Sequence, residues 1–319
     1  MREVGAAVSI INKPSLTAVR TSSARLAGPA LRVPVEQAVS RHLGRPWTAT
    51  AVQDLADFAC HPCAILTDGS CAVFAKFTDA ADGATQFEIE LAGLRFLRES
   101  SGVLTPTPIG LVVVADGTLL VLEAVHAVDR APRHWRQIGQ ALARIHRNTW
   151  DRFGLDRHGY IGPLHLDNTP ASDWPSFYAQ RRILPNLRAA TDSGHLPPEV
   201  IRQVETLLSR LPELCGPPPV PTLLHGDAQQ NNFISTDEGA VVIDPAVCYG
   251  HPEMDLAFVD IWHQAAPDEL FEGYREELPI DPGFWERRDL WRVWGYLAAV
   301  AIEGPSHLDE LTRAIRRYV

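Results

Sequence analysis

Lysine is almost absent from this chain. Of its 29 lysine and arginine residues, only Lys13 and Lys76 are lysine. Lys13 lies in the N-terminal stretch, whereas Lys76 stands in the apolar segment 72–77 (AVFAKF). Because arginine supplies nearly every other cation, a lysine in the body of the chain indicates a position that needs a compact, flexible ammonium group.

Other absences narrow the class of protein. No apolar run is long enough to cross a bilayer, so we expect no membrane partner. The five cysteines are an odd number scattered over 319 residues, which argues against a disulfide framework and favours the reducing cytoplasm. A formal net charge of −10 argues against a nucleic-acid partner, because phosphate backbones bind basic surfaces. We expect a monomer that acts on a small molecule.

The negative charge is concentrated in residues 245–290. This segment holds eleven acidic residues and only three arginines. An acidic surface beside a cleft would attract a cationic substrate. A solvated helix face explains the same composition and is the interpretation that we favour.

The chain is long enough for two lobes that share a cleft. Residues 1–33 are rich in arginine and poor in acids, so we expect a flexible or loosely docked extension, with an organelle-targeting peptide as the alternative. Residues 34–123 should form an N-lobe of antiparallel strands with one helix between the third and fourth strands. Residues 124–319 should form a larger, mostly helical C-lobe, which gives an α+β fold.

The pattern gives approximate bounds for these elements. The strands expected in the N-lobe are residues 47–54, 63–66, 71–77, 109–114 and 118–123, and the expected helices include 35–43, 85–99, 135–146 and 199–211.

An Asp, an Asn and a second Asp follow one another at a spacing typical of phosphoryl-transfer sites. They are Asp227, Asn232 and Asp244, and a hairpin expected over residues 233–243 should bring Asp244 back beside Asn232. In such sites the first Asp accepts the proton of the attacking hydroxyl, whereas the Asn and the second Asp hold the Mg²⁺ that neutralises the phosphates of ATP. We therefore expect Asp227 to be catalytic, with Asn232 and Asp244 as metal ligands.

The nucleotide should be bound mainly by the N-lobe. Lys76 is expected to contact the α- and β-phosphates, and Glu90, on the following helix, is the anion expected to hold it. Backbone groups from Glu123 to Val125 should form the hinge that binds adenine. The loop between the first two strands has no glycine, so His61 is expected to supply a donor that a Gly-rich turn would otherwise provide.

Other polar residues near these motifs have more than one interpretation. Cys60 and Cys63 have C-x-x-C spacing, but no second ligand pair accompanies them, so packed thiols are favoured over zinc. Asp255 is expected to brace the catalytic loop through hydrogen bonds to its backbone. Asp173 and Trp174 begin a helix, and Trp174 either lines the substrate side or packs at the helix start.

His225 is more readily explained as a residue that packs within the catalytic loop. A metal-dependent hydrolase that used His225, Asp227 and Asp244 is a further alternative, but it would leave Lys76 without a function.

These motifs resemble those of the fructosamine (ketosamine) 3-kinases, which belong to the aminoglycoside phosphotransferase-like, protein-kinase-like superfamily. The resemblance covers about residues 47–300 and rests on 222–227 (TLLHGD), Asn232 and 242–250 (VIDPAVCYG), with segments 74–76, 87–94, 138–146, 153–154, 159–164, 173–178 and 180–185. It implies a bilobal kinase-like fold and ATP-dependent phosphorylation of a ketosamine hydroxyl. Lys76, Glu90, Asp227, Asn232 and Asp244 match the family's functional positions.

Two segments depart from the family pattern. The residues after Asp227 are Ala-Gln-Gln-Asn, where the family has Leu-Trp-Ser-Gly, and this change alters the wall beside the acceptor hydroxyl. The loop before the second strand is Cys60-His61-Pro62-Cys63, where the family has Gly and Ser.

Two alternative functions stay open. The acidic segment 245–290 suggests an aminoglycoside or other antibiotic phosphotransferase. The glycine-free loop suggests a catalytically weak nucleotide-binding kinase homologue.

Overall fold

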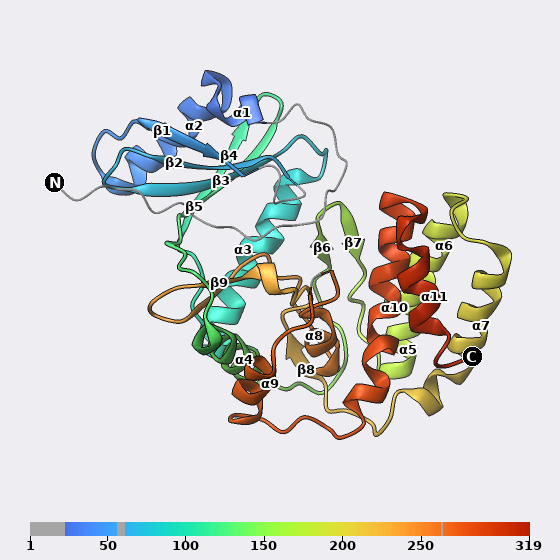
Figure 1. Ribbon diagram of the computed structural model, residues 1–319. Helices are drawn as coiled ribbons and strands as arrows, with labels where there is room; N and C mark the ends of the chain where they lie inside the picture. Colours follow the sequence, from blue (N-terminus) through green and yellow to red (C-terminus); the bar gives the residue numbers. More distant parts are fainter. Residues whose placement is uncertain (1–22, 56–60, 263) are drawn as a thin grey trace.

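The N-terminal part of the molecule is built on a sheet and the rest is mostly helical (Figure 1). The computed structural model describes residues 23–55, 61–262 and 264–319. A five-stranded antiparallel sheet has the order β1-β2-β3-β5-β4, and one helix, α3 (Gly83–Ser101), connects its third and fourth strands. The predicted α+β class is confirmed. The strands are β1 (Ala51–Asp54), β2 (Cys63–Thr67), β3 (Ala72–Thr78), β4 (Pro108–Val114) and β5 (Gly117–Glu123).

Side chains alternate between the two faces of the sheet, as the two-residue period of a strand requires. Val73, Ala75 and Phe77 of β3 pack in one buried cluster, together with Leu119 and Val121 of β5. The intervening residues of both strands face α3: Leu120 and Leu122 pack against Phe87, Leu91 and Leu94. Lys76 occupies a position between Ala75 and Phe77, so its side chain shares the face that looks toward α3 and the second lobe.

Two helices cover the outer face of the sheet. They are α1 (Ser23–Ala27) and α2 (Pro29–Leu43), and Figure 1 shows them in blue above the strands. The helix expected from residue 35 starts earlier, at Pro29. Proline is favoured at the first helical position, because the N–H that it lacks would have no partner within the helix there. Leu26 and Leu31 are buried in the sheet cluster, so residues 23–33 of the expected extension pack on the sheet. Residues 1–22 lie outside the described residues.

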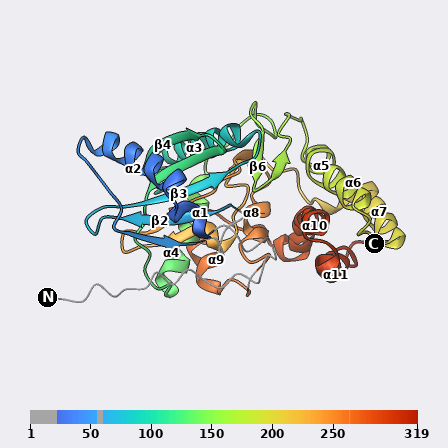
Figure 2. The same ribbon diagram turned by 90° about the horizontal axis from the view of Figure 1, so that it is seen from above.

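The C-terminal part surrounds a second, larger core. Its elements are α4 (Pro132–His146), α5 (Trp174–Tyr178), a π-helical turn η2 (Ala179–Ile183), α6 (Leu184–Asp192), α7 (Pro198–Leu214), α8 (Glu253–Phe258), α9 (Asp268–Arg275), α10 (Phe284–Glu303), η4 (Pro305–His307) and α11 (Leu308–Ile315). The view from above places α5, α6, α7, α10 and α11 together, away from the sheet (Figure 2). Trp174 is 1% exposed and contacts Phe177, Tyr178 and Trp291. Packing at the helix start is therefore the correct interpretation of Trp174.

Three short hairpins or strand pairs stand between these helices. They are β6 (Gly159–Ile161) with β7 (Leu164–Leu166), β8 (Thr222–Leu224) with β11 (Cys248–Gly250), and β9 (Phe233–Ser235) with β10 (Ala240–Val242). The hairpin expected over residues 233–243 is confirmed. Each pair has only three residues per strand, so tertiary contacts and not strand length stabilise them.

Most of the acidic segment is a solvated surface, as we favoured, but three of its acids are not. Five of its acids are exposed (Asp268, Glu272, Glu276, Asp281 and Glu286), and three are partly exposed (Glu269, Glu277 and Asp289). Glu253, Asp255 and Asp260 are buried, and Asp260 accepts from Arg288 and Arg292. Burying a carboxylate is unfavourable unless it is paired and hydrogen-bonded, so these acids are engaged in internal pairs. Among the described residues, no acid of segment 245–290 lines the interlobe pocket. The described part also contains no helix long and apolar enough to span a membrane.

Helices α4 and α9 cross at two glycines. A Cβ added at Gly139 would overlap the carbonyl oxygen of Leu270, and one added at Gly273 would overlap the carbonyl oxygen of Arg136. We predict that Gly139→Ala lowers the free energy of unfolding by more than about 2 kcal/mol, because backbone at the crossing must move apart. Urea unfolding measures the change. Arg133→Ala, on the exposed side of α4, is the control, and an equal loss in both variants would contradict the close crossing.

Candidate active site

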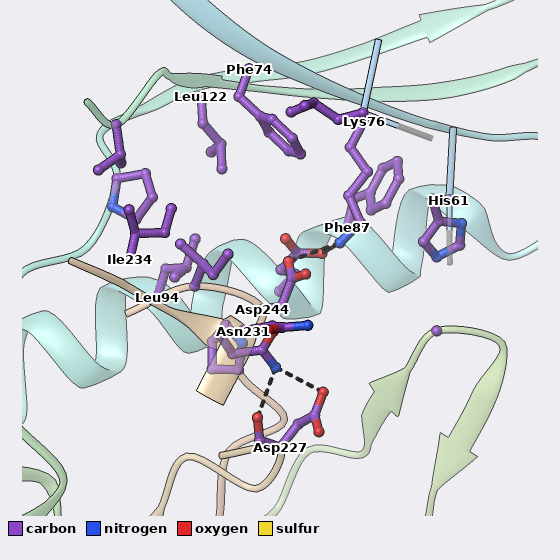
Figure 3. Close-up of a pocket in the computed structure, with 18 of the residues that line it drawn as sticks. His61, Phe74, Lys76, Phe87, Leu94, Leu122, Asp227, Asn231, Ile234 and Asp244 are labelled. Atoms are coloured by element: carbon purple, nitrogen blue, oxygen red, sulfur yellow. Dashed lines mark hydrogen bonds and ion pairs between the residues drawn. The ribbon is translucent and has the colours of Figure 1, made fainter. Parts of the chain in front are cut away.

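One pocket lies between the sheet and the helical lobe, and it brings together every residue predicted for the site (Figure 3). The sheet side contributes a lysine, a histidine and an apolar wall, and the helical side contributes two aspartates and two asparagines. The predicted residues that line it are His61, Lys76, Glu90, Glu123, Val125, Asp227, Asn232 and Asp244. Lys76 and Asp244, which lie 168 positions apart in sequence, are in direct contact here.

The loop that carries Asp227 follows β8 and is fixed by a buried carboxylate. The backbone N–H groups of His225 and Gly226 donate to Asp255, at 2.7 and 3.0 Å. Gly226 has φ of +82° and an added Cβ would overlap the carbonyl of Ala246, so only glycine fits this turn. The predicted bracing role of Asp255 is confirmed.

His225 packs within the same loop, as expected. Its Nε2 lies 2.9 Å from the carbonyl oxygen of Ile243, and the N–H of Asp227 donates to its Nδ1 at 3.2 Å. Both ring nitrogens are thus engaged with backbone groups, and the ring packs against Phe233. This arrangement does not favour a hydrolase in which His225 acts on substrate.

The carboxylate of Asp227 is buried and is held by two side-chain amides. Asn232 Nδ2 donates to its Oδ2 at 2.9 Å, and Gln229 Nε2 lies 3.1 Å from both oxygens. Burial raises the pKa of Asp227, while nearby His225 and the two amide donors act in the opposite direction. Asp227 therefore has a stronger affinity for a proton than an exposed Asp.

Asn232 and Asp244 are brought together by the hairpin between them. The N–H of Ile243 donates to the carbonyl oxygen of Asn232 at 3.0 Å, which places Asp244 beside Asn232. Asn232 uses its Nδ2 to bind Asp227, so its side-chain carbonyl oxygen is the group left for a cation. Asp244 has φ of +51°, the single non-glycine residue with positive φ in the described part. Such a conformation is unfavourable and is found where function requires it.

The ammonium of Lys76 is shared by two carboxylates. Its Nζ lies 2.9 Å from Glu90 Oε2 on α3 and 2.9 Å from Asp244 Oδ1 (Figure 3). The expected pairing with Glu90 is confirmed, and the contact with Asp244 adds the second lobe. Burial disfavours the charge of Lys76, but the two carboxylates outweigh it and raise its pKa. Desolvation would raise the pKa of Asp244, yet Lys76 lowers it to about 2. Burial, and to a smaller degree the charge of Asp244, raises the pKa of Glu90, while Lys76 acts in the opposite direction.

His61 also faces this cluster, from the segment just before β2. Its ring packs edge-on against Phe87. Burial, and to a smaller degree the charge of Lys76, lowers the pKa of His61 to about 4. The ring is therefore neutral at pH 7 and offers one N–H donor to the pocket. Residues 56–60, which include Cys60, lie outside the described residues.

The backbone after β5 forms the far end of the pocket. The N–H of Glu123 donates to Thr107 and that of Ala124 donates to Ala72, at 2.9 and 3.0 Å. These contacts hold the segment at the sheet edge. The backbone N–H of Val125 donates to no acceptor among the described residues. This N–H and the carbonyl oxygen of Glu123 can therefore form hydrogen bonds with a ligand.

Several lining residues were not predicted from the sequence. Phe74, Leu94, Leu122 and Ile234 make an apolar wall on both sides of the pocket (Figure 3). The β6–β7 hairpin adds Tyr160, Ile161 and Gly162, and the loop after Asp227 adds Gln229 and Asn231. The turn Gly162-Pro163 was the available signal for the hairpin. Of the four residues that depart from the family pattern, only Gln229 and Asn231 line the pocket.

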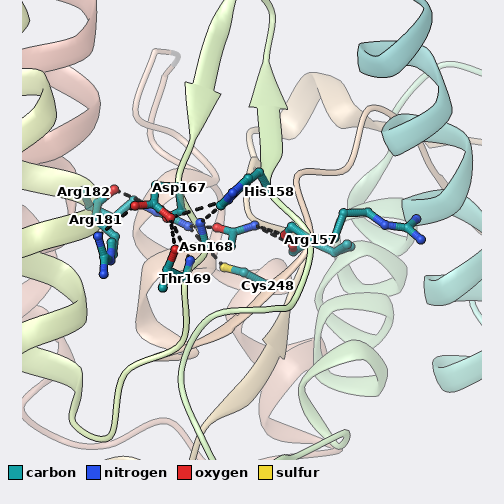
Figure 4. A network of polar contacts seen from close by, with 9 residues as sticks. Arg157, His158, Asp167, Asn168, Thr169, Arg181, Arg182 and Cys248 are labelled. Atoms are coloured by element: carbon teal, nitrogen blue, oxygen red, sulfur yellow. Dashed lines mark hydrogen bonds and ion pairs between the residues drawn. The ribbon is translucent and has the colours of Figure 1, made fainter.

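A buried arginine anchors the base of the β6–β7 hairpin (Figure 4). Arg182 is 1% exposed and donates to Asn168 Oδ1 at 2.6 Å, to the carbonyl of Asp167 at 2.9 Å and to Cys248 Sγ at 3.5 Å. Asn168 in turn donates to the carbonyls of Arg157 and Val247. The network ties the end of β7 to η2 and to β11, and so fixes the hairpin over the pocket.

The described part gives no support for a structural metal. No group of three or more His, Cys, Asp or Glu side chains in residues 23–55, 61–262 and 264–319 is placed to hold one. A catalytic Mg²⁺ needs fewer protein ligands, because substrate phosphates and water complete its coordination.

A two-lobed fold with a lysine, a glutamate and two aspartates in the interlobe cleft defines a protein-kinase-like phosphotransferase. Residues 33–319 match the model of the fructosamine kinase family. The chain therefore belongs to this family and is a kinase.

Individual relatives agree with this assignment. The chain is 30% identical over 284 residues to a "Probable ketoamine kinase" of Vibrio cholerae, which covers 88% of this chain and 96% of the relative. It is 28% identical over 253 residues to the mouse ketosamine-3-kinase, covering 70% and 81%. The crystal structure of an inferred fructosamine-3-kinase from Thermobifida fusca has a TM-score of 0.78 and 34% identity, covering 89% and 98%.

The fold extends to more distant enzymes. A thermostable mutant of an aminoglycoside phosphotransferase has a TM-score of 0.59 at 14% identity, covering 88% of this chain and 96% of that enzyme. This similarity concerns the fold, and the family match does not favour the antibiotic-modifying alternative.

The lowered pKa of His61 predicts a loss of stability in acid. The usual pKa of histidine is 6.5 and the value in the folded protein is about 4. The contribution of neutral His61 to the free energy of unfolding is therefore complete above pH 6.5 and is lost as the pH falls toward 4. The free energy of unfolding should fall between pH 7 and pH 4.5. We predict that this fall is smaller in His61→Gln by on the order of 2 kcal/mol, because glutamine does not titrate. Urea unfolding at both pH values measures this. His165→Gln, at an exposed position, should follow the wild type, and identical pH dependence in all three proteins would contradict the prediction.

Proposed function

We propose that the protein transfers the γ-phosphoryl group of ATP to a hydroxyl of a ketosamine. The observation that carries this proposal is the position of Lys76, which reaches Asp244 across the cleft while Asp227 lines the same pocket. The names of the relatives, ketoamine kinase and ketosamine-3-kinase, support the substrate class and the hydroxyl on the third carbon.

The residues present fit a nucleotide. The apolar wall of Phe74, Leu122 and Ile234 suits a base, and the backbone groups of Glu123 and Val125 suit its polar edge. Lys76 and neutral His61 would hold the phosphates. We place the lobe boundary at Glu123, so that residues 34–123 bind the nucleotide and residues 124–319 bind the acceptor.

The residues present also fit a magnesium ion. The carboxylate of Asp244 and the side-chain carbonyl oxygen of Asn232 are hard oxygen ligands of the type that Mg²⁺ prefers. The left-handed backbone of Asp244 supports the same role, because residues held in such conformations cluster at functional sites. When bound, Mg-ATP supplies the phosphoryl group and the positive charge that stabilises its transfer.

Asp227 is the proposed base for the acceptor. Its carboxylate orients the attacking hydroxyl and accepts the proton. Asn232, a proposed metal ligand, donates a hydrogen bond to one oxygen of this carboxylate. The proposed base and the proposed metal ligand therefore keep a fixed position relative to each other. A catalytically weak kinase homologue is less well supported, because Lys76, Asp227 and Asp244 are all present.

A single chain supplies all of these groups, which supports a monomeric enzyme. The use of ATP and the absence of any disulfide among the described cysteines support the cytoplasm as its location.

We predict that Asp227→Asn lowers kcat for ATP-dependent phosphorylation of a fructosamine by about 10²–10⁴-fold, because the amide cannot accept the proton. Binding of Mg-ADP, measured by calorimetry, should change less than about threefold, since Asp227 does not hold the nucleotide. Asp237→Asn, in the exposed turn between β9 and β10, is the matched control. Near-normal turnover in Asp227→Asn would show that Asp227 is not the base.

A further inference from the structure

Gln229 lies beside the catalytic carboxylate in a fixed orientation. Its side chain is only 8% exposed and lines the interlobe pocket. Its Nε2 lies 3.1 Å from both oxygens of Asp227. A carboxylate only accepts hydrogen bonds, so the amide nitrogen must face it. This requirement turns the amide oxygen, Oε1, away from Asp227.

That oxygen has no hydrogen-bond partner in the part of the chain that the structure describes. Gln229 Oε1 is buried and accepts no hydrogen bond among the described residues, and the same is true of Asn231 Oδ1. Both residues line the same pocket. The ammonium of Lys76 does not reach either oxygen: its two hydrogen bonds go to Glu90 and Asp244. Buried carbonyl oxygens are almost always hydrogen-bonded, so this wall indicates a ligand that brings donors.

The adjacent glutamine provides the contrast. Gln230 is 5% exposed and is not among the pocket-lining residues. Its Nε2 donates to the carbonyl oxygen of Gln264 at 3.3 Å. Both glutamines donate through Nε2 within the protein, but only Gln229 lines the pocket and has a buried side-chain oxygen without a partner among the described residues.

We propose that Gln229 determines acceptor specificity by accepting a hydrogen bond from the amine of the ketosamine through Oε1, while its Nε2 positions Asp227. This inference rests on the proposed function. A ketosamine carries its amine on the first carbon and its phosphorylated hydroxyl on the third, so a strong donor lies two carbons from the reacting oxygen. The Asp227 carboxylate and Gln229 Oε1 form a matching pair of adjacent acceptors, one for the hydroxyl and one for the amine.

The test compares two acceptors in three proteins. The acceptors are N-methyl fructosamine and its counterpart in which an ether oxygen replaces the amine nitrogen. The proteins are the wild type, Gln229→Met and Gln230→Met, which carry the same change at adjacent buried positions. Wild type should favour the amine at least about tenfold in kcat/KM, as expected for a hydrogen bond from a charged donor. In Gln229→Met this preference should fall below about threefold, whereas Gln230→Met should keep it.

The comparison separates the two functions of the side chain. Loss of the Nε2 contact with Asp227 lowers kcat for both acceptors equally, so it cancels in the ratio, whereas loss of the Oε1 contact raises KM for the amine alone. Calorimetry with Mg-ADP establishes that Gln229→Met is folded, and Gln229→Ala replaces it if it is not. A wild type without preference for the amine, or a preference retained in the Gln229 variant, would overturn the inference and leave the proposed function intact. Failure of the wild type to phosphorylate either acceptor would overturn the proposed function itself.

Discussion

The ammonium of Lys76, held between Glu90 and Asp244, is the interaction on which the rest of the site depends. Each carboxylate lies 2.9 Å from Nζ, and they come from positions 14 and 168 residues along the chain. Buried charges require partners, so this one lysine joins β3, α3 and the segment after β10. It sets the distance between the lobes and points Asp244 into the cleft. The compact ammonium that the rarity of lysine indicated is thus the group that two carboxylates share.

A second set of contacts places Asp227 opposite this cluster. Asp255 accepts from the backbone of the loop, and its Oδ2 also lies 3.1 Å from His146 Nε2 on α4. His146 Nδ1 lies 2.8 Å from the hydroxyl of Tyr274 on α9. The close crossing of α4 and α9 at their glycines is therefore linked to the geometry of the catalytic loop, which is how packing in the helical lobe reaches the chemistry of the cleft.

The parts that could be predicted from the sequence are those with a local signal. The strands alternate, the Asp227–Asn232–Asp244 spacing is short, and Lys76 is conspicuous because lysine is rare. What could not be predicted depends on tertiary contacts. The three-residue strands β6 and β7 were not predicted, whereas the equally short β9 and β10 were, because a turn that ends in glycine (236–239) separates their apolar runs. Arg182 gives no sign in the sequence that it will be buried. The three buried acids of segment 245–290 could not be told from its exposed acids, because some of their partners, such as His146 and Arg292, lie outside the segment.

The central claim is that Lys76 and Asp227, from opposite sides of one cleft, carry out phosphoryl transfer to a sugar amine. Phosphorus NMR of wild type and Lys76→Met incubated with Mg-ATP and N-methyl fructosamine tests it most directly. The account predicts that wild type forms ADP and one phosphorylated sugar in equal amounts and that Lys76→Met, although folded, forms neither at a comparable rate. Equal rates in the two proteins, or ADP formed without a phosphorylated sugar, would contradict it.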